Sequence, residues 1–367
     1  MTPNWFAAIM GTGIVATSGV ALHSDFPGLG ALTTAFWLLA SFGLVIATAL
    51  FLRGGPAKHA ADPMMAHFYG APAMALLTVG AGTIELGPQV LGADVAIWVG
   101  GMLWIAGTAA GIFTALWIPF RMIAGAQSAE SGAMPSWLMP VVPPMVAAAS
   151  GSLLIQHITP GQLRLGVLAI CYGMFGMSLL VGFLTIGMVY SRLIHRGLPS
   201  VQVAPTVWIM LGVIGQSITA AVLLGNNSKF VFQGDEAPIA GGLHIFGIGY
   251  GLVMTGFAVF VLLLAVSLTV HNVRRGLSFT PAWWSFTFPI GTCVTGSAAL
   301  AFATDSVLLL VISGSMYVLL LLAWIAVASR SAVMVLSDRI ATFRLSQTQV
   351  SVQPASAATA PEPLTVG

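Results

Sequence analysis

Hydroxyl and aromatic side chains surround a proline inside one long apolar stretch of this chain. In the segment SFTFPIGT, residues 285–292, Pro289 has as close neighbours Phe286, Thr287, Phe288 and Thr292. Proline removes a backbone hydrogen bond, so a carbonyl about one turn earlier loses its usual donor. Water in a cavity can solvate that carbonyl, whereas lipid leaves it unpaired. We therefore expect the break to face a wet path, where threonine hydroxyls solvate a small ion and a phenylalanine ring closes the column.

Catalytic chemistry is not indicated elsewhere in the sequence. The chain contains no HExxH, GxSxG or Walker motif. Its glycine-rich segments, GTGIVATSG and FGIGYG, lie in apolar stretches, where close packing explains them better than nucleotide binding. Cys171 and Cys293 both fall inside apolar stretches, which argues against a disulfide framework or a metal cluster. We predict a protein that is not an enzyme and that needs no metal and no cofactor.

The elements that must position these residues are membrane-spanning helices. The chain of 367 residues is 57% hydrophobic and only 6% charged, too few charges to cover a soluble domain. Apolar runs of about 18 or more residues indicate membrane helices, and lipid leaves no partner for unpaired backbone. The sequence predicts an all-α integral membrane protein with ten spans: 4–22, 31–52, 67–86, 93–118, 137–156, 165–190, 205–225, 239–270, 280–304 and 306–329.

The distribution of Lys and Arg predicts the orientation. With ten spans, both termini share one side with the loops that follow even-numbered spans, and that side carries ten of the 12 basic residues. Only Arg164 and Lys229 fall on the other side. The positive-inside rule then places both termini in the cytoplasm. The net charge of +2 reflects this bias and gives no reason to expect nucleic acid as a partner.

Prolines distinguish the odd-numbered spans from the even-numbered ones. Every odd span has a proline in or beside it, and we expect helix kinks at Pro72, Pro143, Pro144 and Pro289. Span ten is bulky and apolar, as a lipid-facing helix should be, and spans four and eight carry GxxxG spacing. One interpretation is that proline and glycine are simply common in membrane helices. We favour five helical hairpins, with odd helices lining a central pore and even helices outside.

The odd spans also hold most of the small polar side chains, and we expect six of them to line the path: Thr12, Thr78, Ser150, Gln216, Thr287 and Thr292. No Lys or Arg lies within a span core. We interpret Glu85, His67 and His244 as residues of the membrane interface. A neutral path of hydroxyls, amides and helix dipoles suits an anion. These groups attract the anion, and without a fixed positive charge they bind it weakly enough for release. This favours a channel or facilitated exporter over a tightly coupled pump.

Two motifs carry a family resemblance. PNWFAAIMGTGIVA (Pro3–Ala16) and AWWSFTFPIGT (Ala282–Thr292) resemble the tellurite-resistance/dicarboxylate transporter family. That family includes tellurite-resistance channel homologues, malate permeases, sulfite exporters and plant slow-type (voltage-dependent) anion channels. The resemblance covers roughly residues 3–330. It implies a homotrimer in which each subunit has its own pore, with five inner and five outer helices and a phenylalanine plug on the ninth helix. Phe288 matches that gate better than Phe286, although packing between helices is the alternative for Phe288.

The expected activity is transport of an anion across a plasma (inner) membrane by a multi-pass protein embedded in the lipid bilayer. The absence of basic residues from the span cores favours a small inorganic anion such as chloride, nitrate or sulfite over a C4-dicarboxylate such as malate. A proton- or ion-coupled C4-dicarboxylate or sulfite efflux carrier is the alternative. We expect residues 1–330 to form the transmembrane domain. Residues 331–367, which end in a Ser/Ala/Pro-rich stretch, are expected to form a largely disordered cytoplasmic tail.

Overall fold

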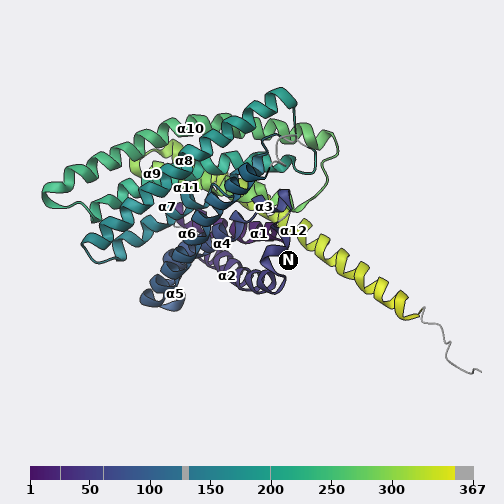
Figure 1. Cartoon of the computed structure of the whole chain (residues 1–367). Coiled ribbons are helices and arrows are strands. Elements are labelled where there is room, and N and C mark those ends of the chain that lie inside the picture. Colours follow the sequence, from purple (N-terminus) through teal and green to yellow (C-terminus); the bar gives the residue numbers. More distant parts are fainter. Residues whose placement is uncertain (25, 61, 126–131, 199, 352–367) are drawn as a thin grey trace, which may run out of the picture. The chain divides into compact units, whose positions relative to one another are not determined.

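The computed structural model describes residues 1–24, 26–60, 62–125, 132–198 and 200–351. Within these ranges every regular element is a helix, and no strand occurs (Figure 1). The chain divides into two units, residues 1–325 and 326–367. The first unit contains the helices described below, and the second begins within the last helix. The prediction of an all-α fold is confirmed.

Five helices form the centre of the first unit. They are α1 (Phe6–Ala21), α4 (Gly70–Leu86), α7 (Pro143–Leu154), α9 (Ile209–Asn227) and α11 (Thr287–Thr304). Each contacts the next in chain order, and α11 also contacts α1, so the five helices close into a ring. Their side chains are buried on nearly all sides: in the span Pro135–His157, 94% of the most apolar window is buried. These are the odd-numbered helices of the sequence prediction.

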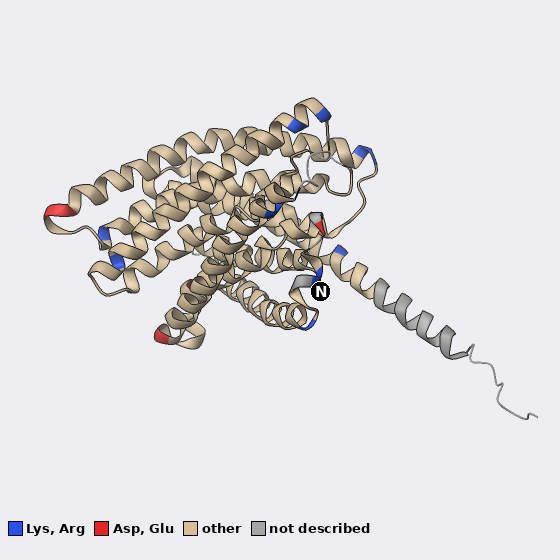
Figure 2. Cartoon of the chain, viewed as in Figure 1, with Lys and Arg blue, Asp and Glu red and all other residues tan. Residues whose placement is uncertain are grey.

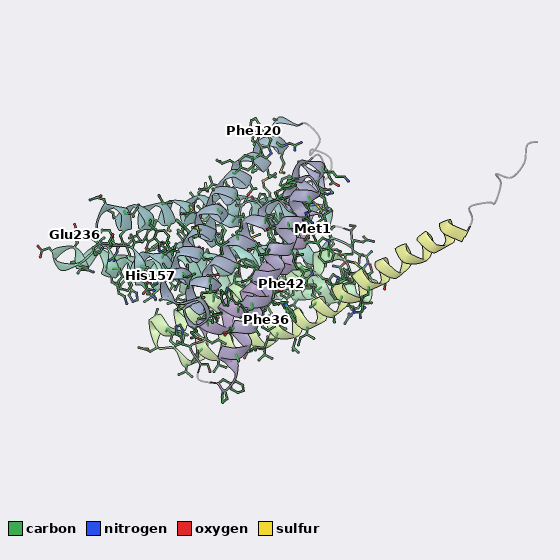
Figure 3. The ribbon with its side chains drawn as sticks, turned by 90° about the horizontal axis from the view of Figure 1, so that it is seen from below. Met1, Phe36, Phe42, Phe120, His157 and Glu236 are labelled. Carbon is green, nitrogen blue, oxygen red and sulfur yellow. The ribbon has the colours of Figure 1, made fainter. Side chains whose placement is uncertain are left out.

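Long helices cover the outside of the ring. They are α2 (Leu29–Arg53), α6 (Ala93–Ala124), α8 (Gln162–Arg196), α10 (Ala237–Arg274) and α12 (Val307–Ser351). The first four each pack against two consecutive inner helices. Only 11% of the most apolar window of Gly234–Arg274 is buried, and Phe42 and Phe120 are 68% and 60% exposed (Figure 3). Large exposed apolar side chains around the whole periphery fit contact with lipid. The predicted arrangement of inner and outer helices is thus confirmed.

The first part of α12, up to Ile325, completes this outer layer. Ser313 donates a hydrogen bond to the backbone oxygen of Val294 in α11 (2.9 Å), and the indole nitrogen of Trp324 donates to Oγ1 of Thr12 in α1 (3.0 Å). Thus α12 bridges the last and first inner helices, as α2 bridges α1 and α4. Beyond the predicted span, α12 continues as a helix to Ser351, so part of the expected tail is helical. Residues 352–367 lie outside the described part of the chain.

Short helices connect the inner and outer helices or extend their ends. They are α3 (Pro63–His67), α5 (Pro88–Leu91), η1 (Pro3–Trp5), η2 (Pro56–His59), η4 (Pro135–Leu138), η5 (Ile155–His157), η6 (Ala204–Trp208), η7 (Ser228–Phe230), η8 (Gly234–Glu236) and η9 (Pro281–Phe286). Four inner helices, α1, α7, α9 and α11, are preceded by a 3₁₀ helix with proline in its first turn.

The prolines at which we expect helix kinks lie where α-helices begin. Pro143 and Pro144 are the first two residues of α7, while Pro72 and Pro289 are the third residues of α4 and α11. The first-turn backbone N–H groups have no partner inside the α-helix, so proline is tolerated there. The break in these spans is therefore a change of helix type at their starts. The sequence could not separate the two possibilities, because proline lacks the same N–H group in both.

Glycines let the inner helices approach closely. A Cβ atom added at Gly215 of α9 would lie 2.8 Å from the backbone nitrogen of Cys293 in α11. One added at Gly291 of α11 would overlap the side chain of Ile14 in α1. Helix contact in membranes depends on such small residues, because lipid supplies no hydrophobic drive between apolar helices. Both of these close approaches involve α11.

Charged side chains gather at the two ends of the helices (Figure 2). Arg53, Arg121, Arg196 and Arg274 lie at the C-terminal ends of the outer helices, the end at which the inner helices begin. Eight helical segments within the described residues are long and apolar enough to span a membrane. At 16 and 17 residues, α1 and α4 are shorter than 18 residues. The structure thus confirms a multi-pass helical protein, while the count of ten spans stays a prediction.

Candidate ion pathway

A cavity of about 300 Å³ lies inside the ring, on the side toward the C-terminal ends of the inner helices. We call it the polar cavity. All five inner helices contribute to its wall, and no residue of the outer helices does. The wall carries hydroxyls, amides, one imidazole and one carboxyl group: Thr17, Thr78, Ser150, Thr219, Thr295, Gln156, Gln216, Asn226, Asn227, His23 and Glu85. Among the residues that the structure describes, no Lys or Arg occurs in this wall.

The hydroxyl groups of the wall are held by their own helices. Thr78 donates to the backbone oxygen of Met74 (2.7 Å), and Ser150 donates to that of Val146 (2.8 Å). A hydroxyl hydrogen rotates freely, so these groups can turn from a carbonyl toward a passing ion. The amide groups of Gln156 and Gln216 add further N–H donors. The polar cavity can thus solvate a small anion without a fixed positive charge.

Phe288 stands between the polar cavity and a second, smaller one. The second cavity, about 20 Å³ in volume, lies toward the N-terminal ends of the inner helices. We call it the apolar cavity, because methionine, phenylalanine, valine, alanine and isoleucine form most of its wall; Ser285 and Pro289 also contribute. Phe288 belongs to the walls of both cavities and is only 3% exposed. Phe288 is the one described residue that the two walls share.

Three of the six residues expected to line the path lie in the wall of the polar cavity: Thr78, Ser150 and Gln216. Thr12 belongs to neither cavity and accepts the hydrogen bond from Trp324 of α12. Thr287 and Thr292 are fully buried between helices. Thr287 donates to the backbone oxygen of Trp284, and Thr292 donates to that of Pro289, both at 2.8 Å. These three threonines lie at helix contacts.

Phe286 differs from Phe288 in position. It lies at the end of η9 and contributes to neither cavity wall. Its ring meets those of Trp208 and Trp283 edge to face, with centroids 5.3 and 5.7 Å apart. Such aromatic contacts stabilise the packing of η6 against η9. Of the two phenylalanines considered for the gate, only Phe288 lies between the cavities.

Glu85 lies in the wall of the polar cavity, whereas the sequence suggested a place at the membrane interface. Its Oε2 atom is buried and accepts no hydrogen bond from the described groups. The spacing of Thr78, Ala81 and Glu85 could have indicated this position, because residues at i, i+3 and i+7 share one face of a helix. All three line the cavity.

The two histidines assigned to the interface each contact a polar side chain of the protein. Nδ1 of His67 lies 3.4 Å from the hydroxyl of Ser136, and the His67 side chain is 8% exposed. Nδ1 of His244, on α10, lies 2.7 Å from Oδ1 of Asn226, a residue of the polar cavity. His244 therefore contacts a wall residue of the polar cavity from an outer helix.

Comparisons with known proteins agree over nearly the whole chain. The sequence matches the protein family described as voltage-dependent anion channel over residues 1–332. An uncharacterized transporter of Methanocaldococcus jannaschii is 31% identical over 306 residues, which cover 80% of this chain and 82% of that protein. A sulfite efflux pump of Trichophyton rubrum is 28% identical over 311 residues, which cover 80% of each chain. The family match includes all five inner helices.

Proposed function

Because this chain belongs to the voltage-dependent anion channel family, we propose that it conducts small inorganic anions through its ring of inner helices, with Phe288 as the gate. The protein is a helical membrane protein that functions in anion transport. The observation that carries the finer proposal is the position of Phe288 in the walls of both cavities. An aromatic ring there fills the bore, and the apolar side chains beside it disfavour water, which is the hydrophobic mode of gating.

The electrostatics of the bore support an anion as the conducted species. The inner helices α1, α4, α7, α9 and α11 all run in the same sense, so five helix N-termini surround the apolar cavity. Each N-terminus carries a partial positive charge of about half an elementary charge. An anion entering from that end meets positive dipoles first and the hydroxyl and amide donors of the polar cavity next. No basic side chain in either wall would hold the ion too strongly to leave.

Sulfite is the first small anion to test, because several relatives are named sulfite efflux pumps. Chloride and nitrate fit the same neutral wall. A C4-dicarboxylate is the second candidate, and a proton- or ion-coupled carrier is the second mechanism. We favour the small inorganic anion and the uncoupled path because a dicarboxylate would bring two carboxylate groups to a wall in which no described residue is Lys or Arg.

The assembly and the orientation belong to the same proposal. We infer a homotrimer in the plasma (inner) membrane, with a separate path in each subunit and both termini cytoplasmic. The basic residues at the end where the inner helices begin support this orientation, since cytoplasmic ends of membrane helices are rich in Lys and Arg (Figure 2). The polar cavity then faces the outer side of the membrane.

Anion-replacement flux in proteoliposomes tests this function. The purified full-length protein is reconstituted with a gradient of chloride, nitrate, sulfite or malate, and the voltage at zero current is measured with and without a proton gradient. We expect this voltage to follow the gradient of the small anion and to ignore the proton gradient. Flux of malate alone, or a voltage that follows the proton gradient, would favour the coupled dicarboxylate carrier.

A further inference from the structure

One carboxyl group belongs to the wall of the proposed anion path. Glu85 lies in the last turn of α4, and its side chain lines the polar cavity together with those of Thr17, Gln156 and Asn226. Its Oε2 atom is buried without a hydrogen-bond donor among the described groups. A buried ionised carboxylate normally has donors or a cation beside it. This carboxyl group has an environment suited to its neutral form.

The charges around Glu85 give no compensation for a negative charge. Among the described residues no Lys or Arg lines the cavity, and the helices packed against α4, which are α1, α2, α6 and α7, bring no Lys or Arg to it. The other titratable groups described at this end of the helices are His23, Asp94, His157, Arg164, Lys229, Asp235, Glu236, His244 and Asp305. Arg164 donates to the backbone oxygens of Ile158 and Phe230, and His244 contacts Asn226. Of these, only His23 lines the polar cavity.

An anion in the polar cavity changes the protonation of this group. An ionised Glu85 would repel the anion within one small, poorly solvated volume. A protonated Glu85 removes that repulsion and adds an O–H donor, which can hydrogen-bond the anion. Binding of a proton to Glu85 and binding of an anion to the cavity should therefore favour each other, as linkage requires.

We propose that Glu85 is the proton-binding residue of the anion path, so that the polar cavity admits an anion when this carboxyl group is protonated. This inference rests on the proposed function and adds its regulation. The carboxylate takes its proton from hydronium in the solution on the side that the cavity faces and returns it to the same solution when the anion has left, so no net proton transport is required. Anion flux should rise as the pH falls, because low pH populates the neutral carboxylic acid.

The test uses chloride and nitrate, which do not titrate in the range of interest, at equal pH on both sides of proteoliposomes. Wild-type flux should fall with rising pH, by up to about tenfold per pH unit where the carboxyl group is mostly ionised. Glu85→Gln keeps an N–H donor and cannot ionise, so its flux should stay near the wild-type low-pH level at every pH. The matched control is Glu236→Gln, an exposed carboxyl group at the same end of the molecule, which should keep the wild-type pH profile (Figure 3).

Two further variants separate Glu85 from the nearby histidines. His23→Gln and His244→Gln should each retain the dependence on pH. The inference is overturned if wild-type flux does not change with pH, if Glu85→Gln keeps the wild-type profile, or if a histidine variant abolishes it. Absence of any anion flux in the wild-type protein at every pH would contradict the proposed function itself.

Proton uptake gives a second measurement if Glu85→Gln fails to fold. The wild-type protein in detergent, in weakly buffered solution at a pH where flux is low, is mixed with nitrate while the pH is recorded. We expect uptake of protons on addition of nitrate, because the anion favours the neutral carboxyl group. No uptake at nitrate concentrations that saturate flux would overturn the inference.

Discussion

Thr78 and Thr12 show that a buried threonine of the ring can either face the polar cavity or make a hydrogen bond between helices. Both are buried threonines on inner helices, and both donate to a carbonyl four residues earlier, at 2.7 Å. Thr78 faces the polar cavity, whereas Thr12 faces α12 and accepts a hydrogen bond from Trp324. The hydroxyl of Thr12 satisfies an indole N–H that would otherwise be unpaired within the apolar layer. Polar groups of inner helices therefore serve the path or the packing according to the face they occupy.

Thiol accessibility distinguishes these two uses. Single cysteines at Thr78 and Gln216, in a background without Cys171 and Cys293, should react with a small water-soluble thiol reagent. Cysteines at Thr12 and Thr292 should react at least about tenfold more slowly, because reaction requires access of the reagent to the thiolate. Labelling is followed by mass spectrometry of protein in vesicles. Equal rates at Thr78 and Thr12 would contradict the placement of the polar cavity.

Removal of the Trp324 hydrogen bond tests the packing use of Thr12. Thr12→Val keeps the volume of the side chain but leaves the indole N–H of Trp324 without its acceptor, at a cost of about 1–3 kcal/mol. We expect a lower unfolding temperature and no direct loss of anion flux per folded molecule. Ser315→Ala on the exposed face of α12 is the control and should change neither quantity. A Thr12→Val protein with unchanged stability would argue against this contact.

Among the elements, α9 and α11 depend on close approach. Gly215 leaves no space for a Cβ atom, because the backbone of residues 292 and 293 lies against it. Backbone atoms cannot turn aside as a flexible side chain can. The close approach of α11 to α9 therefore depends on the absence of a side chain at Gly215.

Gly215→Ala should destabilise the ring. A methyl group forced into this contact costs about 1–3 kcal/mol, because the two helices must separate. Thermal unfolding of the purified protein in detergent measures the loss. Gly249→Ala on α10, where an added Cβ meets nothing within 4 Å, is the matched control and should be neutral or slightly stabilising. Equal unfolding temperatures for the two variants would show that α9 and α11 are not packed this closely.

The sequence predicted which helices are inner and which are outer. It did not predict which residues of the inner helices face the cavity. Prolines and small polar residues marked the inner helices because such groups need protein or water around them, while bulky apolar residues marked the outer ones. The inner helices, however, are buried on nearly all sides, so hydrophobic periodicity gave little indication of which residues face the cavity. Thr12, Thr287 and Thr292 were expected in the path for that reason. Glu85 was assigned to the interface because distance from the end of a span does not show how deep a cavity extends.

At the scale of the whole molecule, charge and helix direction agree. Inner helices begin, and outer helices end, where Arg53, Arg196 and Arg274 lie, while Glu236 lies at the other end (Figures 2 and 3). In the orientation that we propose from this bias of basic residues, the positive ends of the inner helices face the cytoplasm. For an exporter, this end would receive the anion first.

Side-specific labelling tests this orientation. A cysteine in place of Gly54, after α2, should react with an impermeant reagent only from the cytoplasmic side. A cysteine in place of Glu236, before α10, should react only from outside. Both positions are exposed, so burial cannot explain a failure to react. Reaction at position 54 from the outside of intact cells would reverse the orientation and, with it, the side that the polar cavity faces.

The conductance of Phe288→Ala, compared with Phe286→Ala, tests the central claim most directly. Loss of the Phe288 ring would join the two cavities; if the ring contributes a barrier of about 1.4 kcal/mol or more, anion conductance should rise about tenfold or more. Phe286 lies outside both walls, so Phe286→Ala should conduct no better than the wild-type protein. Single-channel or vesicle flux recordings at a fixed amount of folded protein give both values. A folded Phe288→Ala protein that conducts anions no faster than the wild type would contradict a path closed by this ring.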